Sequence, residues 1–277
     1  MRLTRFPLWL LMASIAAATL ADEPEKPATT DPLREVYRED AEKCAFSTAD
    51  GESLKLVNEP IMRWTNDGDW SGDVFVWTHK GRPELIGCLL SGPGAGNLRY
   101  IWHEFHLLAE KPIAPATIQN GRRWEPAEGL KLEPAPDAPQ PAQSASARLV
   151  QMRSIARSFT PYMAAESTWE LRLLPQPLLR YGEAESDAID GALFAYVWPK
   201  GTDPEFILLL ECRRTDRETA WYYAPVRFSN RALWLKHGEK EVWRVAGHGE
   251  PKANATSLIY TTGFARAIPR ETDDSPK

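Results

Sequence analysis

An acidic loop at residues 66–73 has the residue types and spacing of a calcium site. The segment NDGDWSGD offers oxygen ligands at alternate positions: Asp67, Asp69, Ser71 and Asp73. Calcium prefers several such oxygens, and D-x-D-x-S-G reproduces the first half of the helix–loop–helix calcium signature. The closing glutamate of that signature is missing. Calcium is therefore the one cofactor that the sequence suggests, and a polar turn between two strands is the alternative.

The segment WHEFH groups residue types that bind zinc or transfer protons. The zinc-protease signature H-E-x-x-H depends on a helix to bring two imidazoles to one side, and the spacing here differs. In a strand alternate residues share a face, so Glu104 and His106 could act together as acid and base if they lined a cleft. A partly exposed strand face is the alternative. The sequence contains no nucleophile motif such as G-x-S-x-G.

The chain contains eleven tryptophans, about three times the usual share. Exposed indole rings on a sheet face can stack on sugar rings, and the candidates for such contact are Trp70, in the acidic loop, and Trp102, beside WHEFH. The alternative for most of the tryptophans is core packing, because several aromatic residues recur at corresponding places in the two halves of the chain.

Arg63 and Arg180 occupy the same place in two similar phrases, SLKLVNEPIMRW and ELRLLPQPLLRY. If the two halves pack about a twofold axis, the two guanidinium groups could converge on an anionic ligand in the crevice between them. The alternative is that each arginine pairs with an acid of its own half, such as Glu84 or Glu205.

The similarity between the two halves continues beyond these phrases. GDVFVWTHKGRPELIGCLLS, which begins at Gly72, has a counterpart in GALFAYVWPKGTDPEFILLLEC, which begins at Gly191. In each, aromatic and β-branched runs are separated by a turn that contains glycine, which is typical of antiparallel hairpins. The preserved order predicts an internal duplication of residues 53–126 and 170–245.

A helix is expected before each repeat, because apolar residues recur at helical spacing in residues 31–44 and 148–159. Between the repeats, LEPAPDAPQPAQSAS contains four prolines and is typical of an extended linker. We therefore predict an α+β fold of two related units, each a helix followed by an antiparallel β-meander of about five strands. The predicted boundaries are 31–126 for the first unit, 127–145 for the linker, 146–246 for the second unit and 247–277 for a C-terminal segment with a polar tail.

The N-terminus has the order of a secretory signal peptide. Two arginines precede an apolar run, small residues and acids follow it, and cleavage after Ala21 would remove residues 1–21. The apolar run is too short to anchor the chain in a bilayer. We expect a secreted or periplasmic protein with no membrane span.

Charge and cysteine content narrow the classes of partner. Acidic residues outnumber basic ones by 38 to 33, so the chain offers no positive field for nucleic acid. The three cysteines, Cys44, Cys88 and Cys212, allow one disulfide in an oxidising compartment but do not indicate which pair would form it. Buried free thiols are the alternative.

The phrases RLVQMRSIARSF, ELRLLPQPLLRY, DGALFAYVW and DPEFILLLE, with GRPE and WHEFHLL in the first half, follow one another in a characteristic order. In this order the chain resembles a family of secreted bacterial proteins with no assigned activity. The resemblance covers most of the chain after the signal peptide and implies a common fold and export. It carries over no catalytic or binding residues, and the acidic loop departs from the family's pattern.

The sequence thus favours a secreted, non-enzymatic binding or scaffolding protein whose partner is an envelope glycan or another protein. The alternative is an extracytoplasmic hydrolase with its site in the crevice between the two units. No residue is assigned a catalytic role. A cavity that gathers Glu104, His106 and the acidic loop would favour the hydrolase, and an aromatic strip without titratable groups would favour binding.

Overall fold

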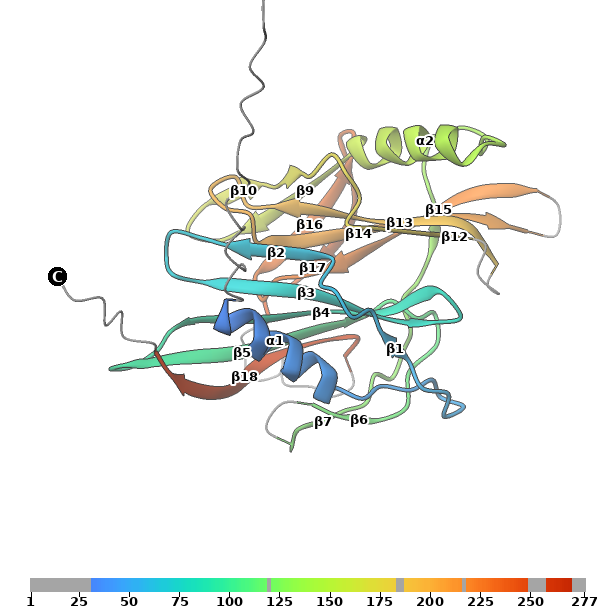
Figure 1. Ribbon diagram of the computed structural model, residues 1–277. Helices are drawn as coiled ribbons and strands as arrows, with labels where there is room; N and C mark the ends of the chain where they lie inside the picture. Colours follow the sequence, from blue (N-terminus) through green and yellow to red (C-terminus); the bar gives the residue numbers. More distant parts are fainter. Residues whose placement is uncertain (1–30, 119–120, 183–186, 216–217, 249–257, 271–277) are drawn as a thin grey trace, which may run out of the picture. The chain divides into compact units, whose positions relative to one another are not determined.

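The computed structural model describes residues 31–118, 121–182, 187–215, 218–248 and 258–270 (Figure 1). The signal peptide predicted at residues 1–21 lies outside these ranges. The chain divides into a short unit, Met1–Asp31, and a large one, Pro32–Lys277, to which all that follows refers. The described part of the large unit is mainly antiparallel β-sheet with two helices, α1 (Pro32–Lys43) and α2 (Ala145–Arg157). This arrangement fits the predicted α+β class, and it fits a mainly-β class as well.

The first large sheet has the order β1-β3-β4-β5-β18, and β2 also pairs with β3. Its strands are β1 (Lys55–Leu56), β2 (Met62–Thr65), β3 (Ser71–His79), β4 (Arg82–Pro93), β5 (Leu98–Leu107) and β18 (Tyr260–Pro269).

The second large sheet has the order β11-β13-β14-β15-β8, and β12 also pairs with β13. Its strands are β8 (Glu133–Pro134), β11 (Arg172–Leu173), β12 (Leu179–Gly182), β13 (Ala188–Val197), β14 (Pro204–Arg214) and β15 (Thr219–Arg227).

Two smaller sheets complete the described part of the chain. The third sheet has the order β10-β9-β16-β17, and β6 pairs with β7 in a short hairpin. The bounds are β6 (Ala116–Thr117), β7 (Arg123–Trp124), β9 (Phe159–Ala164), β10 (Thr168–Glu170), β16 (Ala232–His237) and β17 (Lys240–Val245).

The two large sheets share strand order and register from β1-β3-β4-β5 to β11-β13-β14-β15, whereas their edge strands β18 and β8 are not counterparts. Leu56 lies opposite Trp77 in the first sheet, and Leu173 lies opposite Tyr196 in the second. Both the β3–β4 and the β13–β14 hairpins then contain a β-bulge directly after that aromatic residue. A bulge bends its strand and changes the direction in which a side chain points. The two hairpins therefore present their bulged residues at corresponding places.

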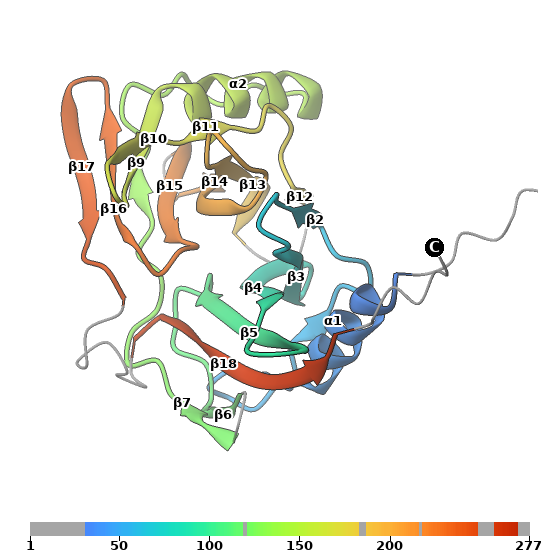
Figure 2. The ribbon, with the colours of Figure 1, turned by 90° about the vertical axis from the view of Figure 1, so that its left-hand side faces the viewer.

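The inner faces of the two large sheets pack on each other. Their shared apolar cluster includes Val74 and Ile86 from the first sheet and Leu193 and Ile207 from the second, all fully buried. Apolar residues on the other faces of the same strands meet α1 in the first sheet, and α2 with the third sheet in the second (Figure 2). Each large sheet is thus buried on both faces, which explains the continuous apolar runs of β4 and β14.

Each helix is tied to its sheet by an arginine that pairs with a buried aspartate. Arg34 of α1 forms an ion pair with Asp73 of β3. Arg148 of α2 donates from Nε to Asp190 of β13 at 2.8 Å. Ser144 caps α2 by accepting a hydrogen bond from the amide of Ala147, which satisfies one of the free N–H groups of the first turn.

Two segments contribute more structure than the sequence predicts. The C-terminal segment, predicted to end in a polar tail, contains β18, which pairs along β5. The linker supplies β8 at the edge of the second sheet, and its Leu130 is buried between the two large sheets. All three cysteines are unpaired, and Cys88 and Cys212 are buried.

A buried ion pair joins the inner faces of the two large sheets at one end. Arg82 Nε, at the start of β4, lies 2.8 Å from Glu211 Oε1 on β14, and Glu211 is fully buried. Tyr181 donates its hydroxyl to the same carboxylate oxygen at 2.6 Å. Arg82 also reaches Glu84 at 3.2 Å and the carbonyl oxygen of Leu108 at 3.2 Å. These contacts compensate a guanidinium group that would be very costly to bury alone.

We predict that Arg82→Met lowers the free energy of unfolding by about 3–5 kcal/mol, because it leaves the fully buried Glu211 with only the hydroxyl of Tyr181 and the more distant Arg213, at 3.7 Å, as partners. Urea unfolding of the purified protein measures the change. The control is Arg123→Met, which removes an exposed pair with Glu125 and should cost less than about 1 kcal/mol. The double variant Arg82→Met/Glu211→Leu should recover much of the loss. A double variant less stable than the single one would contradict this explanation.

Candidate functional site

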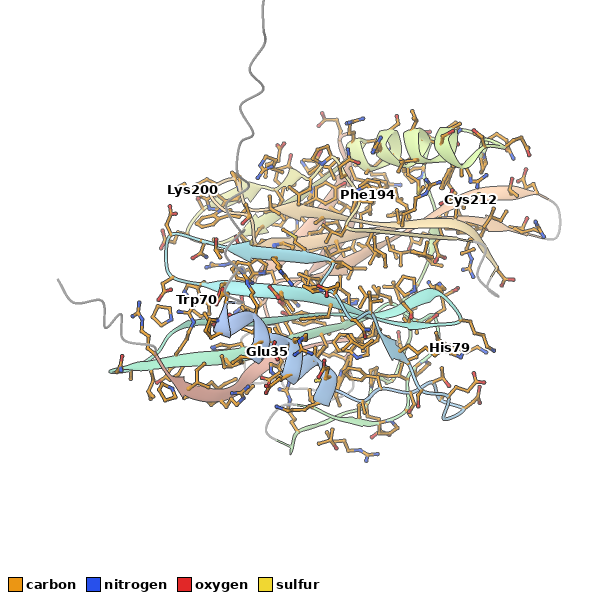
Figure 3. All side chains as sticks on the ribbon, in the orientation of Figure 1. Glu35, Trp70, His79, Phe194, Lys200 and Cys212 are labelled. Carbon is orange, nitrogen blue, oxygen red and sulfur yellow. The ribbon has the colours of Figure 1, made fainter. Side chains whose placement is uncertain are left out.

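A cavity of about 230 Å³ opens between the two large sheets, and we call it the inter-sheet cavity. Glu205, near the start of β14, lines it, whereas Glu211 of the buried ion pair lies near the other end of that strand. Figure 3 shows the same separation, with Trp70 and Lys200 at one end of the strands and His79 and Cys212 at the other. The side chains that give the cavity its chemical character are Trp64, Trp70, Trp102, Glu104, Asp203 and Glu205.

Glycines allow two of the tryptophans to lie flat on the sheet. A Cβ atom at Gly72 would lie 2.8 Å from the ring of Trp64, and one at Gly92 would lie 2.3 Å from the ring of Trp70. Both separations are too short for a Cβ atom, so only glycine fits at these two positions without a shift of the ring. The indole rings of Trp64 and Trp70 are therefore held against the backbone of β3 and β4, where they form one wall of the cavity.

Glu104 contributes a buried carboxyl group to the cavity. It lies on β5, is 9% exposed, and accepts a hydrogen bond from the hydroxyl of Tyr260 on β18. Burial raises the pKa of Glu104 to about 7, because the charged form loses its hydration, while the hydrogen bond from Tyr260 and the charge of Arg227 partly oppose this rise. Near neutral pH the group can therefore hold or release a proton.

Asp203 and Glu205 reach the same cavity from the second sheet. Glu205 is the bulged residue of the β13–β14 hairpin, since Tyr196 lies opposite Phe206 and the next pair skips it. The pKa of Glu205 is raised to about 8, mainly by burial and also by the nearby charges of Asp203 and Glu104, while Ser229 and Arg231 partly oppose the rise. Burial also raises the pKa of Asp203. The cavity therefore combines acids from both halves of the chain.

A second cavity of about 380 Å³ adjoins the first and shares Trp64, Trp70, Asp203 and Glu205 with it. It extends toward the third sheet and also meets Trp198. Within the described residues, the buried indole N–H groups of Trp102 and Trp198 and Oδ1 of Asp203 have no hydrogen-bonding partner. Buried polar atoms are normally paired, but the indole N–H groups of Trp77 and Trp221, which line neither cavity, are unpaired as well.

Three of the sequence-predicted site residues meet in the inter-sheet cavity: Trp70, Trp102 and Glu104. His106 does not join them. It lines a separate cavity of about 570 Å³, with Arg227, and its Nδ1 bonds to the carbonyl oxygen of Leu107 at 2.7 Å. Burial lowers the pKa of His106 to about 4. His103 faces the other side of the sheet, with Nε2 3.1 Å from Asp40.

Arg63 and Arg180 each lie against an aspartate of their own half. Arg180 donates to both carboxylate oxygens of Asp190, at 2.9 and 2.7 Å. Arg63 Nε lies 3.6 Å from Asp73. These contacts match the structural alternative in kind, although Asp73 and Asp190 take the place of the suggested glutamates. Neither arginine lines the inter-sheet cavity.

The acidic loop directs its predicted calcium ligands to different partners. Asp69 pairs with Arg99 at 3.0 Å and with Arg270 at 2.7 Å. Ser71 hydrogen-bonds to Tyr37. Asp73 pairs with Arg34, as described above, and Asp67 is exposed. Across the described ranges no three His, Cys, Asp or Glu side chains lie together as metal ligands. Calcium binding by this loop stays a prediction.

Sequence reasoning did not single out Asp203 and Glu205 as site residues. The signal was present in the two similar triplets Arg82-Pro83-Glu84 and Asp203-Pro204-Glu205, which differ in the charge of their first residue. A charge reversal within an otherwise preserved triplet indicates that Arg82 and Asp203 have different roles.

We predict that Glu104 makes stability depend on pH. Its pKa of about 7 lies above the usual carboxyl value near 4.3, so the folded state binds the proton more tightly than the unfolded state. The free energy of unfolding should therefore fall as pH rises from about 4 to about 7. Glu104→Gln removes this loss and should gain about 3 kcal/mol relative to the wild type between pH 4 and pH 8.

Urea unfolding at a series of pH values measures this change. The matched control is Glu59→Gln. The side chain of Glu59 is 85% exposed, so this substitution should leave the pH dependence of the unfolding free energy unchanged. A difference between Glu104→Gln and the wild type that is constant from pH 4 to pH 8 would show that Glu104 titrates as an ordinary carboxyl.

Comparison of the chain with protein-family models, with curated proteins and with solved structures finds no match. The candidate site is therefore interpreted from its own geometry.

Proposed function

We propose that this protein is an extracytoplasmic, non-enzymatic binding protein whose ligand site is the inter-sheet cavity. The observation that carries the proposal is the meeting of three tryptophans and three carboxylic acids from both halves around one cavity. Concave sites with aromatic walls and a few convergent polar groups are the usual form of small-ligand sites. The ligand is a part of an envelope glycan or of another protein that is small enough to enter.

The character of the walls supports binding over a purely structural role. Trp64 is 6% exposed and packs between the sheets, whereas Trp70 and Trp102 are partly exposed at the cavity. Their rings offer rigid apolar contact, and the unpaired N–H of Trp102 offers a directed hydrogen bond. A ligand here would satisfy a polar atom that the described protein leaves without a partner.

We also propose that the two large sheets, with the helices that precede them, descend from an internal duplication. The matched strand order, register and bulges support this origin. Export is proposed from the signal-peptide pattern of residues 1–21 and from the resemblance to a secreted family. Neither α1 nor α2 has the length and apolar character needed to cross a bilayer.

A hydrolase that uses the same cavity is the second candidate. Glu104 and Glu205 have pKa values of about 7 and about 8, raised by burial. Such groups hold a proton near neutral pH and can donate it to a leaving group. His106 lies in a different cavity and cannot serve as the partner that the sequence suggested.

We predict that replacing the cavity's tryptophans weakens ligand binding. Calorimetric titration with soluble envelope-glycan fragments and short peptides identifies a ligand, and Trp70→Ala and Trp102→Ala should each weaken its binding by about tenfold or more. The control is Trp234→Ala, because Trp234 stacks on Tyr162 in the third sheet and does not line the cavity. A ligand that binds Trp70→Ala and Trp102→Ala as tightly as the wild type would contradict this site.

A cleavage assay and a thermal-unfolding measurement separate the alternatives. If the protein is a hydrolase, it should cleave a bound fragment, and Glu104→Gln should stop cleavage while binding persists. If the acidic loop binds calcium, calcium should raise the thermal midpoint, and Asp67→Ala should abolish the rise. Binding without cleavage would favour the binding protein over the hydrolase.

A further inference from the structure

The two ends of the inter-sheet interface are structurally equivalent. Pro83 lies opposite Thr78, and Pro204 lies opposite Val197, each at the bulge of its hairpin. The backbone repeats the match, because the amide of Leu108 donates to the carbonyl oxygen of Glu84 at 2.8 Å and that of Phe228 to Glu205 at 3.1 Å. Arg82 and Asp203, which precede the two prolines, therefore occupy corresponding positions.

At one end the position is filled by a cation. The guanidinium group of Arg82 lies 3.2 Å from Glu84 and 2.8 Å from Glu211, and it donates to the carbonyl oxygen of Leu108 at 3.2 Å. A glutamate, a carbonyl group and a partner from the opposite sheet thus surround one positive charge.

At the other end the acid is kept, and no described residue supplies the cation at the corresponding position. Glu205 corresponds to Glu84, while Asp203 takes the place of Arg82. Leu90 lies opposite Gly72, as Glu211 lies opposite Gly191, so an apolar residue replaces the second acid.

Glu104 adds a third carboxyl group to this end. It lies opposite Cys88, where the second sheet has Ala224 opposite Leu209. Among the described residues that line the inter-sheet cavity, none is basic.

The nearest basic residues are engaged or lie at the margin. Arg227 donates to the carbonyl oxygens of Ser229 and Arg231, both at 2.6 Å, and its guanidinium lies 4.9 Å from the ring centre of Tyr260. Arg231 is exposed and lines the adjoining cavity but not the inter-sheet cavity. Three acids therefore face the cavity with weak compensation by charge.

The aromatic walls suit the same kind of ligand. Tryptophan rings attract cations through their electron-rich faces, and the attraction grows when the pair is shielded from water. Elsewhere the chain uses this contact, since Lys200 lies 4.8 Å from the ring centre of Trp169 and Arg244 lies 4.9 Å from that of Trp234. Within the described ranges no lysine or arginine stacks in this way on Trp64, Trp70 or Trp102.

We infer that the inter-sheet cavity binds an organic cation, a guanidinium or primary ammonium group, at the position that corresponds to the guanidinium of Arg82. This inference rests on the proposed function and names the chemical class of its ligand. Asp203 and Glu205 bind the positive charge, Glu104 approaches it from the first sheet, and the tryptophans enclose the ligand's carbon atoms. A cation gains attraction from the ionised forms of these acids, which neither an anionic ligand nor a neutral sugar can gain.

Proton release accompanies binding. A bound cation favours the ionised forms of Glu104 and Glu205, whose pKa values are about 7 and about 8 without it. Tyr260, Arg227 and Asp203 also act on Glu104, and Ser229, Asp203, Glu104 and Arg231 act on Glu205. Affinity should therefore increase by about tenfold or more as pH rises from 6 to 8.

Calorimetry with arginine amide tests the inference, and citrulline amide serves as its neutral isostere. Both compounds are used with the α-amino group acetylated, so that the guanidinium group is the only charge in the pair. Arginine amide should bind, and citrulline amide should bind at least about a hundredfold more weakly. Glucosamine and N-acetylglucosamine distinguish an amino sugar from an arginine side chain as the source of the cation. Asp203→Asn should weaken binding of arginine amide by about tenfold or more, whereas the exposed Asp137→Asn should not.

A variant that carries its own cation gives a second readout. Asp203→Arg places a cation beside Glu205 as Arg82 lies beside Glu84 at the other end, so it should raise the thermal midpoint above that of the wild type and abolish binding of arginine amide. Asp203→Leu is the matched control, which removes the acid without adding a cation. An Asp203→Arg midpoint at or below that of Asp203→Leu would overturn the inference.

The outcomes separate this inference from the proposed function. Binding of N-acetylglucosamine or another neutral fragment without binding of arginine amide or glucosamine would overturn the cation inference and leave the cavity as a ligand site. Equal binding of arginine amide and citrulline amide would do the same. Absence of binding by every compound, together with a stabilised Asp203→Arg, would retain the charge argument and contradict the binding protein.

Discussion

The structure depends on how charged side chains are compensated between two apolar sheet faces. The inner faces of the large sheets meet through a fully buried aliphatic cluster, so any charged group there must find its counter-charge inside the protein. At one end Arg82 and Glu211 supply both charges, with Tyr181 as an added donor. At the other end acids from both sheets face a cavity. The interface between the sheets therefore has a buried ion pair at one end and a candidate binding site at the other.

The asymmetry has a simple relation to the proposed duplication. The β3–β4 and β13–β14 hairpins both keep the Pro-Glu pair and its bulge, which set the strand geometry. The residue before the proline is free to change, and it is Arg82 in one copy and Asp203 in the other. Two further positions differ between the ends, because Leu90 takes the place of Glu211 and Glu104 takes the place of Ala224. The strand pairing and the bulge are the same at both ends.

The sequence predicted the secondary-structure elements better than the tertiary contacts between them. Period-two and helical patterns indicated the hairpins and both helices, because these signals are local. The third sheet, and the pairing of β18 with β5, depend on contacts between distant residues that no local pattern reports. Trp70, Trp102 and Glu104 were recognised by residue type and do share a cavity. The sequence suggested Glu205 only as an ion-pair partner for an arginine of its own half, because the direction of its side chain depends on a β-bulge.

The central claim is that buried carboxyl groups without a full counter-charge face the inter-sheet cavity. Side-chain carbon-13 NMR titration of Glu104 and Glu205 tests it most directly, with Glu104→Gln and Glu205→Gln used to assign the signals. The account predicts midpoints at about 7 and about 8 in the unliganded protein. Midpoints for both groups near the ordinary value of about 4.3 would show that solvent or an unrecognised partner already compensates them, and would contradict the account.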